Sequence, residues 1–112
     1  MLGRMQSLQH KTIATKRHDL VQEFGARRVR NTPLAEGIIA GTAVGAAGTG
    51  LRPVIDLLFA PFLCYAMDEL VNSAGKLRYM SGGQFPMPIV FRGPNGAALQ
   101  LSGQHSQAWE SW

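Results

Sequence analysis

A single acidic side chain, Glu36, stands where a carboxylate could do chemistry at the start of a helix. Thr32 can cap a helix, and Pro33 suits the first helical position. Glu36 would then fall in the first turn, where the helix dipole favours a negative charge. Gly41 and Gly45 would share one helix face and let another backbone approach it. The pattern also suits an ordinary helix-start glutamate on a tightly packed helix, so it does not define a site by itself.

Two ring-bearing side chains, Phe62 and His105, are further candidates. Phe62 belongs to a series of apolar residues that recur at helical spacing, so an ordinary core phenylalanine is the simplest interpretation. His105 follows a glycine-rich stretch, where a lone histidine is ordinarily an exposed loop residue. No second histidine or carboxylate lies at ligand spacing from it, which argues against a metal site. Cys64 is the only cysteine, so an internal disulfide is excluded, and its apolar surroundings predict a small core residue.

The elements that must position these residues alternate between helices and strands. We expect a helix at 18–24 ended by Gly25, a strand at 28–30, a helix at 33–48, a buried strand at 52–58, a helix at 61–80 stopped by Gly82 and Gly83, a strand at 88–91, a loop at 93–104 and a helix from 106. Asp68 and Asn72 share a face of the fifth element, where we expect them to be structural hydrogen-bonding residues. The alternation predicts an α/β fold, a parallel sheet flanked by helices.

Size and composition limit the functions open to the chain. It has 112 residues, which is one domain at most, and a net charge of +4. The basic residues at 27–30 have no interleaved aromatics, so we interpret them as a solvated strand edge and expect no nucleic-acid partner. No apolar run reaches the roughly 18 residues of a membrane span, so no membrane partner is expected. Residues 1–18 lack the apolar run of a secretory signal, and we interpret them as a divergent or disordered segment before a partial domain at 19–112.

A series of sequence blocks is more specific than any single motif. The blocks are Arg28-Val29-Arg30-Asn31-Thr32-Pro33-Leu34-Ala35-Glu36, Gly50-Leu51-Arg52-Pro53, Met67-Asp68-Glu69-Leu70-Val71-Asn72, Lys76-Leu77-Arg78-Tyr79-Met80-Ser81-Gly82-Gly83, Pro88-Ile89-Val90-Phe91-Arg92-Gly93-Pro94-Asn95-Gly96 and Gln104-His105-Ser106-Gln107. In this order and spacing they closely resemble the beta subunit of the dehydrogenase component of 2-oxo-acid dehydrogenase complexes. That family includes pyruvate, branched-chain 2-oxo-acid and acetoin dehydrogenases. The resemblance runs from about Phe24 to Trp112.

The resemblance implies an incomplete thiamine diphosphate-binding fold of the transketolase-like pyrimidine-binding type. Glu36 matches the family's catalytic glutamate, which hydrogen-bonds a nitrogen of the cofactor's pyrimidine ring. Phe62 matches the aromatic residue that stacks on that ring. His105 matches a histidine at the mouth of the active site that shuttles protons. Ile89 matches a position whose backbone carbonyl binds a structural potassium ion in some members.

The resemblance also implies partners. The chain has no Gly-Asp-Gly followed by Asn-Asn, the family's magnesium and diphosphate motif, so an alpha subunit would hold the magnesium ion within a heterotetramer. We therefore expect part of a pyruvate dehydrogenase-like enzyme, which decarboxylates a 2-oxo acid oxidatively and passes the acyl group to a lipoyl-bearing acyltransferase core. Its expected location is the bacterial cytoplasm or, alternatively, the mitochondrial matrix. Two alternatives stay open: an acetoin dehydrogenase beta subunit, and a truncated non-catalytic fragment that only interacts with an alpha subunit.

Overall fold

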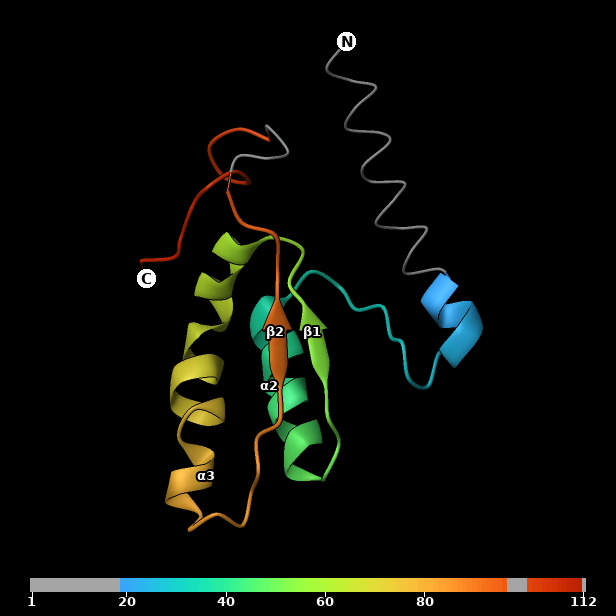
Figure 1. The fold of residues 1–112 in the computed structure, drawn as a ribbon, viewed down its shortest axis with the longest axis vertical. Coiled ribbons are helices and arrows are strands. Elements are labelled where there is room, and N and C mark those ends of the chain that lie inside the picture. Colours follow the sequence, from blue (N-terminus) through green and yellow to red (C-terminus); the bar gives the residue numbers. More distant parts are fainter. Residues whose placement is uncertain (1–18, 97–100, 112) are drawn as a thin grey trace. The chain divides into compact units, whose positions relative to one another are not determined.

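The computed structural model describes residues 19–96 and 101–111, and the chain divides into two units, Met1–Pro33 and Leu34–Trp112 (Figure 1). The expected segment at 1–18 lies outside the described residues. In the first unit, residues 19–24 form the predicted helix, which ends at Gly25 with a φ of 78° that glycine adopts readily. The strand predicted at 28–30 is wrong, because the amides of Arg28 and Val29 both donate to the carbonyl of Gly25 and fold this segment into a turn.

The second unit alternates helices with two short strands. The elements are α2 (Glu36–Gly48), β1 (Val54–Asp56), the 3-10 helix η1 (Ala60–Ala66), the π-helix η2 (Glu69–Ala74), α3 (Leu77–Met80) and β2 (Val90–Arg92). β1 and β2 pair in parallel, with Val54 opposite Val90. α2 contacts β1, η1 and η2, and Figure 1 shows α2 and the column from η1 to α3 beside the strand pair. Helices around a small parallel sheet confirm the predicted α/β class.

Helix α2 starts later than its sequence predicts. Its N-cap is Ala35, whose backbone is not helical (φ −150°, ψ 79°) and whose side chain makes no capping bond. Because a residue in this conformation cannot belong to a helix, Thr32 is not the cap and Pro33 is not the first helical residue. Glu36 does lie in the first turn, as predicted.

The glycines of α2 do not all have the predicted role. A Cβ added at Gly37 would lie 3.2 Å from the backbone carbonyl of Tyr65, so this position permits close contact with η1. At Gly41 the nearest atoms instead belong to the Glu69 side chain, 3.5 Å away, and at Gly45 nothing lies within 4 Å. The predicted close backbone approach therefore occurs at the start of α2, one turn before the expected glycines.

The helical segment from η1 to α3 confirms the predicted boundaries but not a uniform helix. Pro61 lies in its first turn, and Gly82 and Gly83, with φ of 62° and 86°, follow its end. The side-chain amide of Asn72 donates to the carboxylate of Asp68 at 2.6 Å, which confirms the predicted structural pair. Cys64 is exposed, so its predicted core position is wrong.

The strands are shorter than predicted, and the last predicted helix is absent from the described residues 106–111, which form a bend, an irregular stretch and a turn. β1 ends at Asp56 because Leu58 adopts a φ of 67°, which is incompatible with an extended strand. Val54 and Val90 are 64% and 52% exposed, so this part of the sheet is uncovered. This contradicts the prediction of a buried strand at 52–58. Leu57 is buried within that range, and Phe59 is buried just after it.

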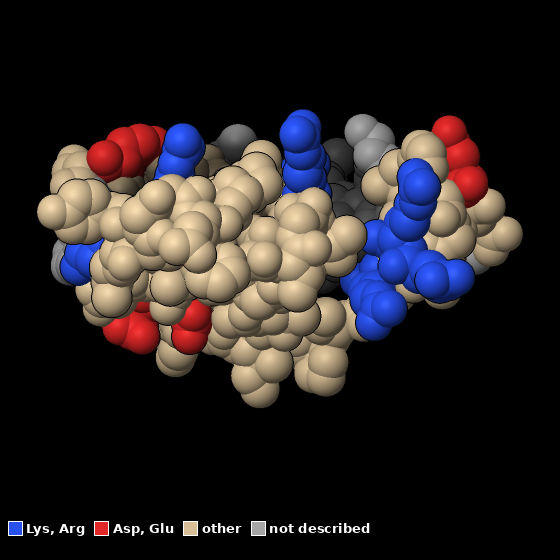
Figure 2. Space-filling view, turned by 90° about the horizontal axis from the view of Figure 1, so that it is seen from below, with Lys and Arg blue, Asp and Glu red and all other residues tan. Residues whose placement is uncertain are grey.

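The core of the described residues is small. Its buried apolar members are Ala40, Ala43, Ala47, Leu57, Phe59 and Ala66. Uncharged residues form most of the surface in the view of Figure 2, and several large apolar side chains are exposed, including Ile38 and Tyr79. Among the described residues, no helix is long and apolar enough to cross a membrane.

Candidate active site

Two of the sequence-predicted site residues, Phe62 and His105, lie in contact. Their ring centroids are 5.4 Å apart and their planes meet at 85°, an edge-to-face arrangement. A third ring, Phe59, completes the cluster, with centroids 5.0 Å from His105 and 5.9 Å from Phe62. Phe59 is buried, whereas Phe62 and His105 are half-buried. The cluster thus consists of two partly accessible rings, Phe62 and His105, packed against the buried ring of Phe59.

The turn between β1 and η1 presents two of these rings. The amide of Phe59 donates to the carbonyl of Leu57 at 2.7 Å, which closes a γ-turn around Leu58. The carboxylate of Asp56 accepts a hydrogen bond from the amide of Leu58 at 3.1 Å. η1 begins directly afterwards, with Phe62 in its first turn and its amide bonded to the carbonyl of Phe59. Backbone bonds therefore fix the positions from which both phenylalanines project.

The chain after β2 is fastened against the same turn. The amide of Leu57 donates to the carbonyl of Arg92, and the amide of Ala60 donates to the carbonyl of Pro94, both at 2.9 Å. A Cβ added at Gly93 would lie 2.9 Å from the backbone nitrogen of Ala60, closer than a real side chain comes. Gly93 is therefore required for the backbone of this loop to pass over the start of η1.

His105 sits on a compact turn that follows this loop. Its amide donates to the carbonyl of Ser102, whose φ is 70°, and the hydroxyl of Ser106 accepts from the amide of Leu101. The amide of Gly96 donates to the carbonyl of Gln107 at 2.7 Å. This bond joins Gly96 to the residue two positions after His105, which lies near the start of η1. His105 is therefore half-buried and is not the exposed loop histidine that a lone histidine in such a stretch ordinarily is.

Glu36 lies at the start of α2, where Gly37 brings this helix against η1. Its side chain is half-buried and makes no hydrogen bond or ion pair within the described part of the chain. A carboxylate in a first turn is favoured by the helix dipole, and its oxygens remain able to accept a hydrogen bond from a ligand. Because α2 and η1 contact each other, Glu36 and Phe62 lie on neighbouring elements.

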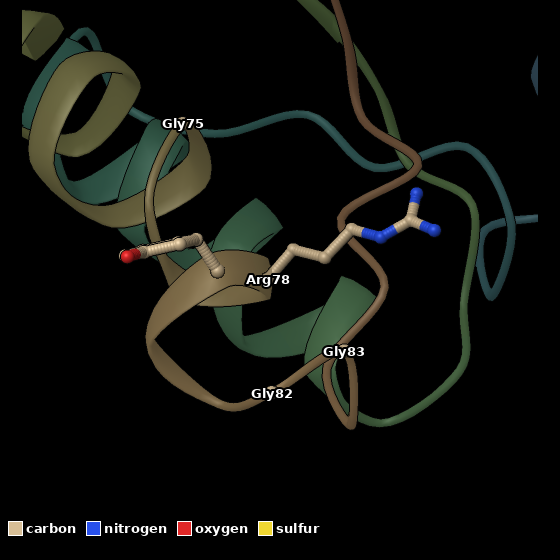
Figure 3. A pocket seen from close by; sticks show the side chains of 5 residues that line it. Gly75, Arg78, Gly82 and Gly83 are labelled. Atoms are coloured by element: carbon tan, nitrogen blue, oxygen red, sulfur yellow. The ribbon is translucent and has the colours of Figure 1, made fainter.

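Other candidate features lie apart from this cluster. Ile89 is half-buried just before β2, and its amide donates to the carbonyl of Met87. No group of three metal-binding His, Cys, Asp or Glu side chains occurs in the part of the chain that the structure describes. A shallow depression lies around α3, where Gly75 and the Gly82–Gly83 turn flank Arg78 (Figure 3). None of the sequence-predicted site residues lines it, and α3 lies at the opposite end of the unit from residues 101–111 (Figure 1).

Comparison with known proteins defines the class of this chain. The family model of the transketolase pyrimidine-binding domain matches residues 10–112, so the chain belongs to the transketolase pyrimidine-binding domain family. It is 55% identical over 93 residues to the pyruvate dehydrogenase E1 component subunit beta of Rhizobium meliloti (strain 1021), an alignment that covers 83% of this chain and 20% of that protein.

Two other relatives are also named as beta subunits of the pyruvate dehydrogenase E1 component. The pyruvate dehydrogenase E1 component subunit beta of Rickettsia bellii (strain RML369-C) is 56% identical over 88 residues, which cover 79% of this chain and 27% of that protein. The mitochondrial subunit of Homo sapiens is 48% identical over 93 residues, covering 83% of this chain and 26% of its own length. The chain therefore spans between a fifth and about a quarter of the length of these relatives.

Sequence reasoning missed two residues that shape this site. Phe59 lies in an apolar run whose spacing gave no reason to separate it from its neighbours. Gly93 had a usable signal, because it stands between Arg92 and Pro94 in one of the blocks that carried the family resemblance. Its steric role becomes visible only when the loop after β2 is placed against η1.

Proposed function

We propose that this chain is the pyrimidine-binding portion of the beta subunit of a thiamine diphosphate-dependent 2-oxo-acid dehydrogenase of the pyruvate dehydrogenase type. The observation that carries the proposal is the contact between Phe62 and His105, because Phe62 lies on η1 and η1 packs against α2, the helix that bears Glu36. The relatives named pyruvate dehydrogenase E1 component subunit beta support pyruvate as the 2-oxo acid.

The side chains present fit the aminopyrimidine group of this cofactor. Phe62 is a half-buried aromatic ring, and stacking on such a ring favours a flat heterocycle. Glu36 has no partner in the described part of the chain, so its carboxylate can accept a hydrogen bond from a ring nitrogen or hold the proton there. When bound, thiamine diphosphate supplies the nucleophilic carbon that attacks the 2-oxo group of the substrate.

The remaining roles follow from side-chain chemistry. His105 would give and accept a proton at the mouth of the site, since an imidazole ring can act both as a general acid and as a general base. The apolar faces of Phe59 and Phe62 would limit water beside it. Ile89 would contribute its backbone carbonyl to a structural potassium site, together with ligands from outside this chain.

Partners complete the proposed enzyme. An alpha subunit would hold the diphosphate through magnesium, because this chain lacks the corresponding sequence motif. The assembled heterotetramer would transfer the acyl group to a lipoyl acyltransferase core, in the cytoplasm of a bacterium or in the mitochondrial matrix. An acetoin dehydrogenase beta subunit and a non-catalytic interaction fragment are the alternatives, of which the relatives' names favour neither.

A hybrid subunit tests the proposal. Residues 20–111 would replace the matching segment of the Rhizobium meliloti beta subunit, which would then be combined with its alpha subunit. We expect thiamine diphosphate-dependent decarboxylation of pyruvate and acetyl transfer to lipoyl. An assembled hybrid that acts on acetoin and not on pyruvate would favour the acetoin alternative, and one that assembles but turns over neither substrate would contradict an enzymatic function.

A further inference from the structure

Phe59 contacts the rings of both Phe62 and His105 in the candidate site. It is 5% exposed, and its plane is perpendicular to the rings of both His105 and Phe62, with centroid distances of 5.0 Å and 5.9 Å. The contact to His105 is the shortest of the three in the cluster. A buried ring with two perpendicular neighbours restricts how either neighbour can rotate, because a rotation would remove an edge-to-face contact.

The backbone that presents Phe59 is itself constrained. Leu58 has a φ of 67°, a conformation that branched or bulky L-residues rarely adopt, and the γ-turn around it is closed by the Phe59 amide. The side chain of Asp56 holds the amide of Leu58, and the chain at Gly93 lies directly against Phe59 and Ala60. Strained backbone of this kind persists only where its surroundings fix it, as they do here.

We propose that Phe59 is a positioning residue, which holds the imidazole of His105 and the ring of Phe62 in one relative orientation. It would act through these two side chains and not on substrate. An imidazole that transfers a proton must keep a defined direction, and His105 sits on a turn where its side chain would otherwise sample several rotamers. The consequence for proton transfer rests on the proposed function, whereas the ring clamp stands on the geometry alone.

Proton NMR of the full 112-residue chain, without cofactor and diluted until light scattering shows a monomer, tests the clamp. The His105 imidazole signals are identified by their loss in His105→Gln. We expect cross-peaks between the Phe59 ring protons and the imidazole protons, and a displacement of the imidazole signals caused by the nearby ring. In Phe59→Leu these signals should move to the positions of a freely rotating histidine, and in Phe59→Tyr, which keeps the ring, they should stay.

Phe85→Leu serves as the matched control, because Phe85 is 46% exposed and makes no ring contact among the described residues. Should Phe59→Leu lose its folded amide spectrum, the cross-peaks of the unsubstituted chain and the Phe59→Tyr variant decide. Missing cross-peaks, or unchanged imidazole signals in a folded Phe59→Leu chain, would overturn the proposal. Since no cofactor or partner is involved, this outcome is independent of the hybrid-subunit experiment, and either proposal can fail alone.

Discussion

The rings of Phe62 and His105 meet edge to face at a centroid distance of 5.4 Å, although Phe62 lies in the first turn of η1 and His105 lies beyond β2. This contact joins the loop after β2 to the start of η1, beside the helix that carries Glu36. An aromatic contact of this type contributes about 0.5–1.5 kcal/mol beyond the area it buries. The two side chains therefore form one local environment, and substitutions in them are expected to separate binding from turnover.

Replacing Glu36 with Gln should abolish most catalysis while leaving assembly intact. The amide keeps the size of the side chain but removes its charge and its ability to take a proton, and loss of such a group costs about 10²- to 10⁴-fold in rate. The measurement is pyruvate turnover by the hybrid subunit with its alpha subunit. Glu110→Gln, at an exposed turn, is the control and should turn over normally. Near-normal turnover by Glu36→Gln would refute the assignment.

Replacing His105 with Ala should lower turnover much more than it lowers cofactor affinity. The imidazole is proposed to move protons, not to hold the cofactor, so its removal acts on kcat. Steady-state kinetics across a range of thiamine diphosphate concentrations separate the two effects. Gln104→Ala, on the neighbouring exposed side chain, is the control. A variant that kept its rate at saturating cofactor but bound it poorly would show that His105 is a binding residue instead.

Replacing Phe62 with Leu should have the opposite signature. Leucine keeps apolar volume but removes the flat ring, and the lost stacking of about 0.5–1.5 kcal/mol corresponds to a roughly 2- to 10-fold weaker cofactor affinity. Turnover at saturating cofactor should change less. Titration of the assembled hybrid with thiamine diphosphate gives the affinity, and an unchanged value would mean that Phe62 packs in the core without stacking on the ligand.

Replacing Gly93 with Ala should destabilise the fold. The new methyl group would lie 2.9 Å from the backbone nitrogen of Ala60, which cannot move without losing its hydrogen bond to Pro94. Overpacking of this kind costs about 1–3 kcal/mol. Urea unfolding of the chain measures the change. Gly103→Ala is the matched control, because nothing lies within 4 Å of its added methyl group. Equal stability of both variants would show that the loop does not pack as described.

The chain on its own should bind thiamine diphosphate at millimolar concentrations or more weakly, and should self-associate. Stacking on Phe62 and one hydrogen bond to Glu36 would contribute roughly 1–3 kcal/mol before association entropy, and no magnesium motif is present for the diphosphate. Val54 and Val90 leave part of the sheet exposed to association. Calorimetry with magnesium and light scattering test this, and a stable monomer with micromolar affinity would contradict it.

Local interactions made several features predictable from the sequence. Pro61 marks the start of the helical segment and Gly82 its end, because proline fits a first turn and glycine adopts positive φ. Asp68 and Asn72 pair because residues four apart share a helix face. The prediction of a strand at 28–30 was wrong because the backbone amides of Arg28 and Val29 donate to Gly25 and not to a neighbouring strand. The non-helical conformation of Ala35 likewise places the start of α2 later than predicted, and no residue type in this stretch indicated it.

By itself the sequence determined the family and the order of helix, strand, helices and strand from α2 to β2, since both depend on local periodicity and on the identity of residues in fixed blocks. The tertiary structure alone decided that His105 contacts Phe59 and Phe62, that Gly93 lies over Ala60, and that Val54 pairs with Val90. These contacts join residues distant along the chain. Their geometry depends on how β2 registers against β1 and on where the γ-turn at Leu58 directs the backbone, neither of which is encoded in any short stretch of residues.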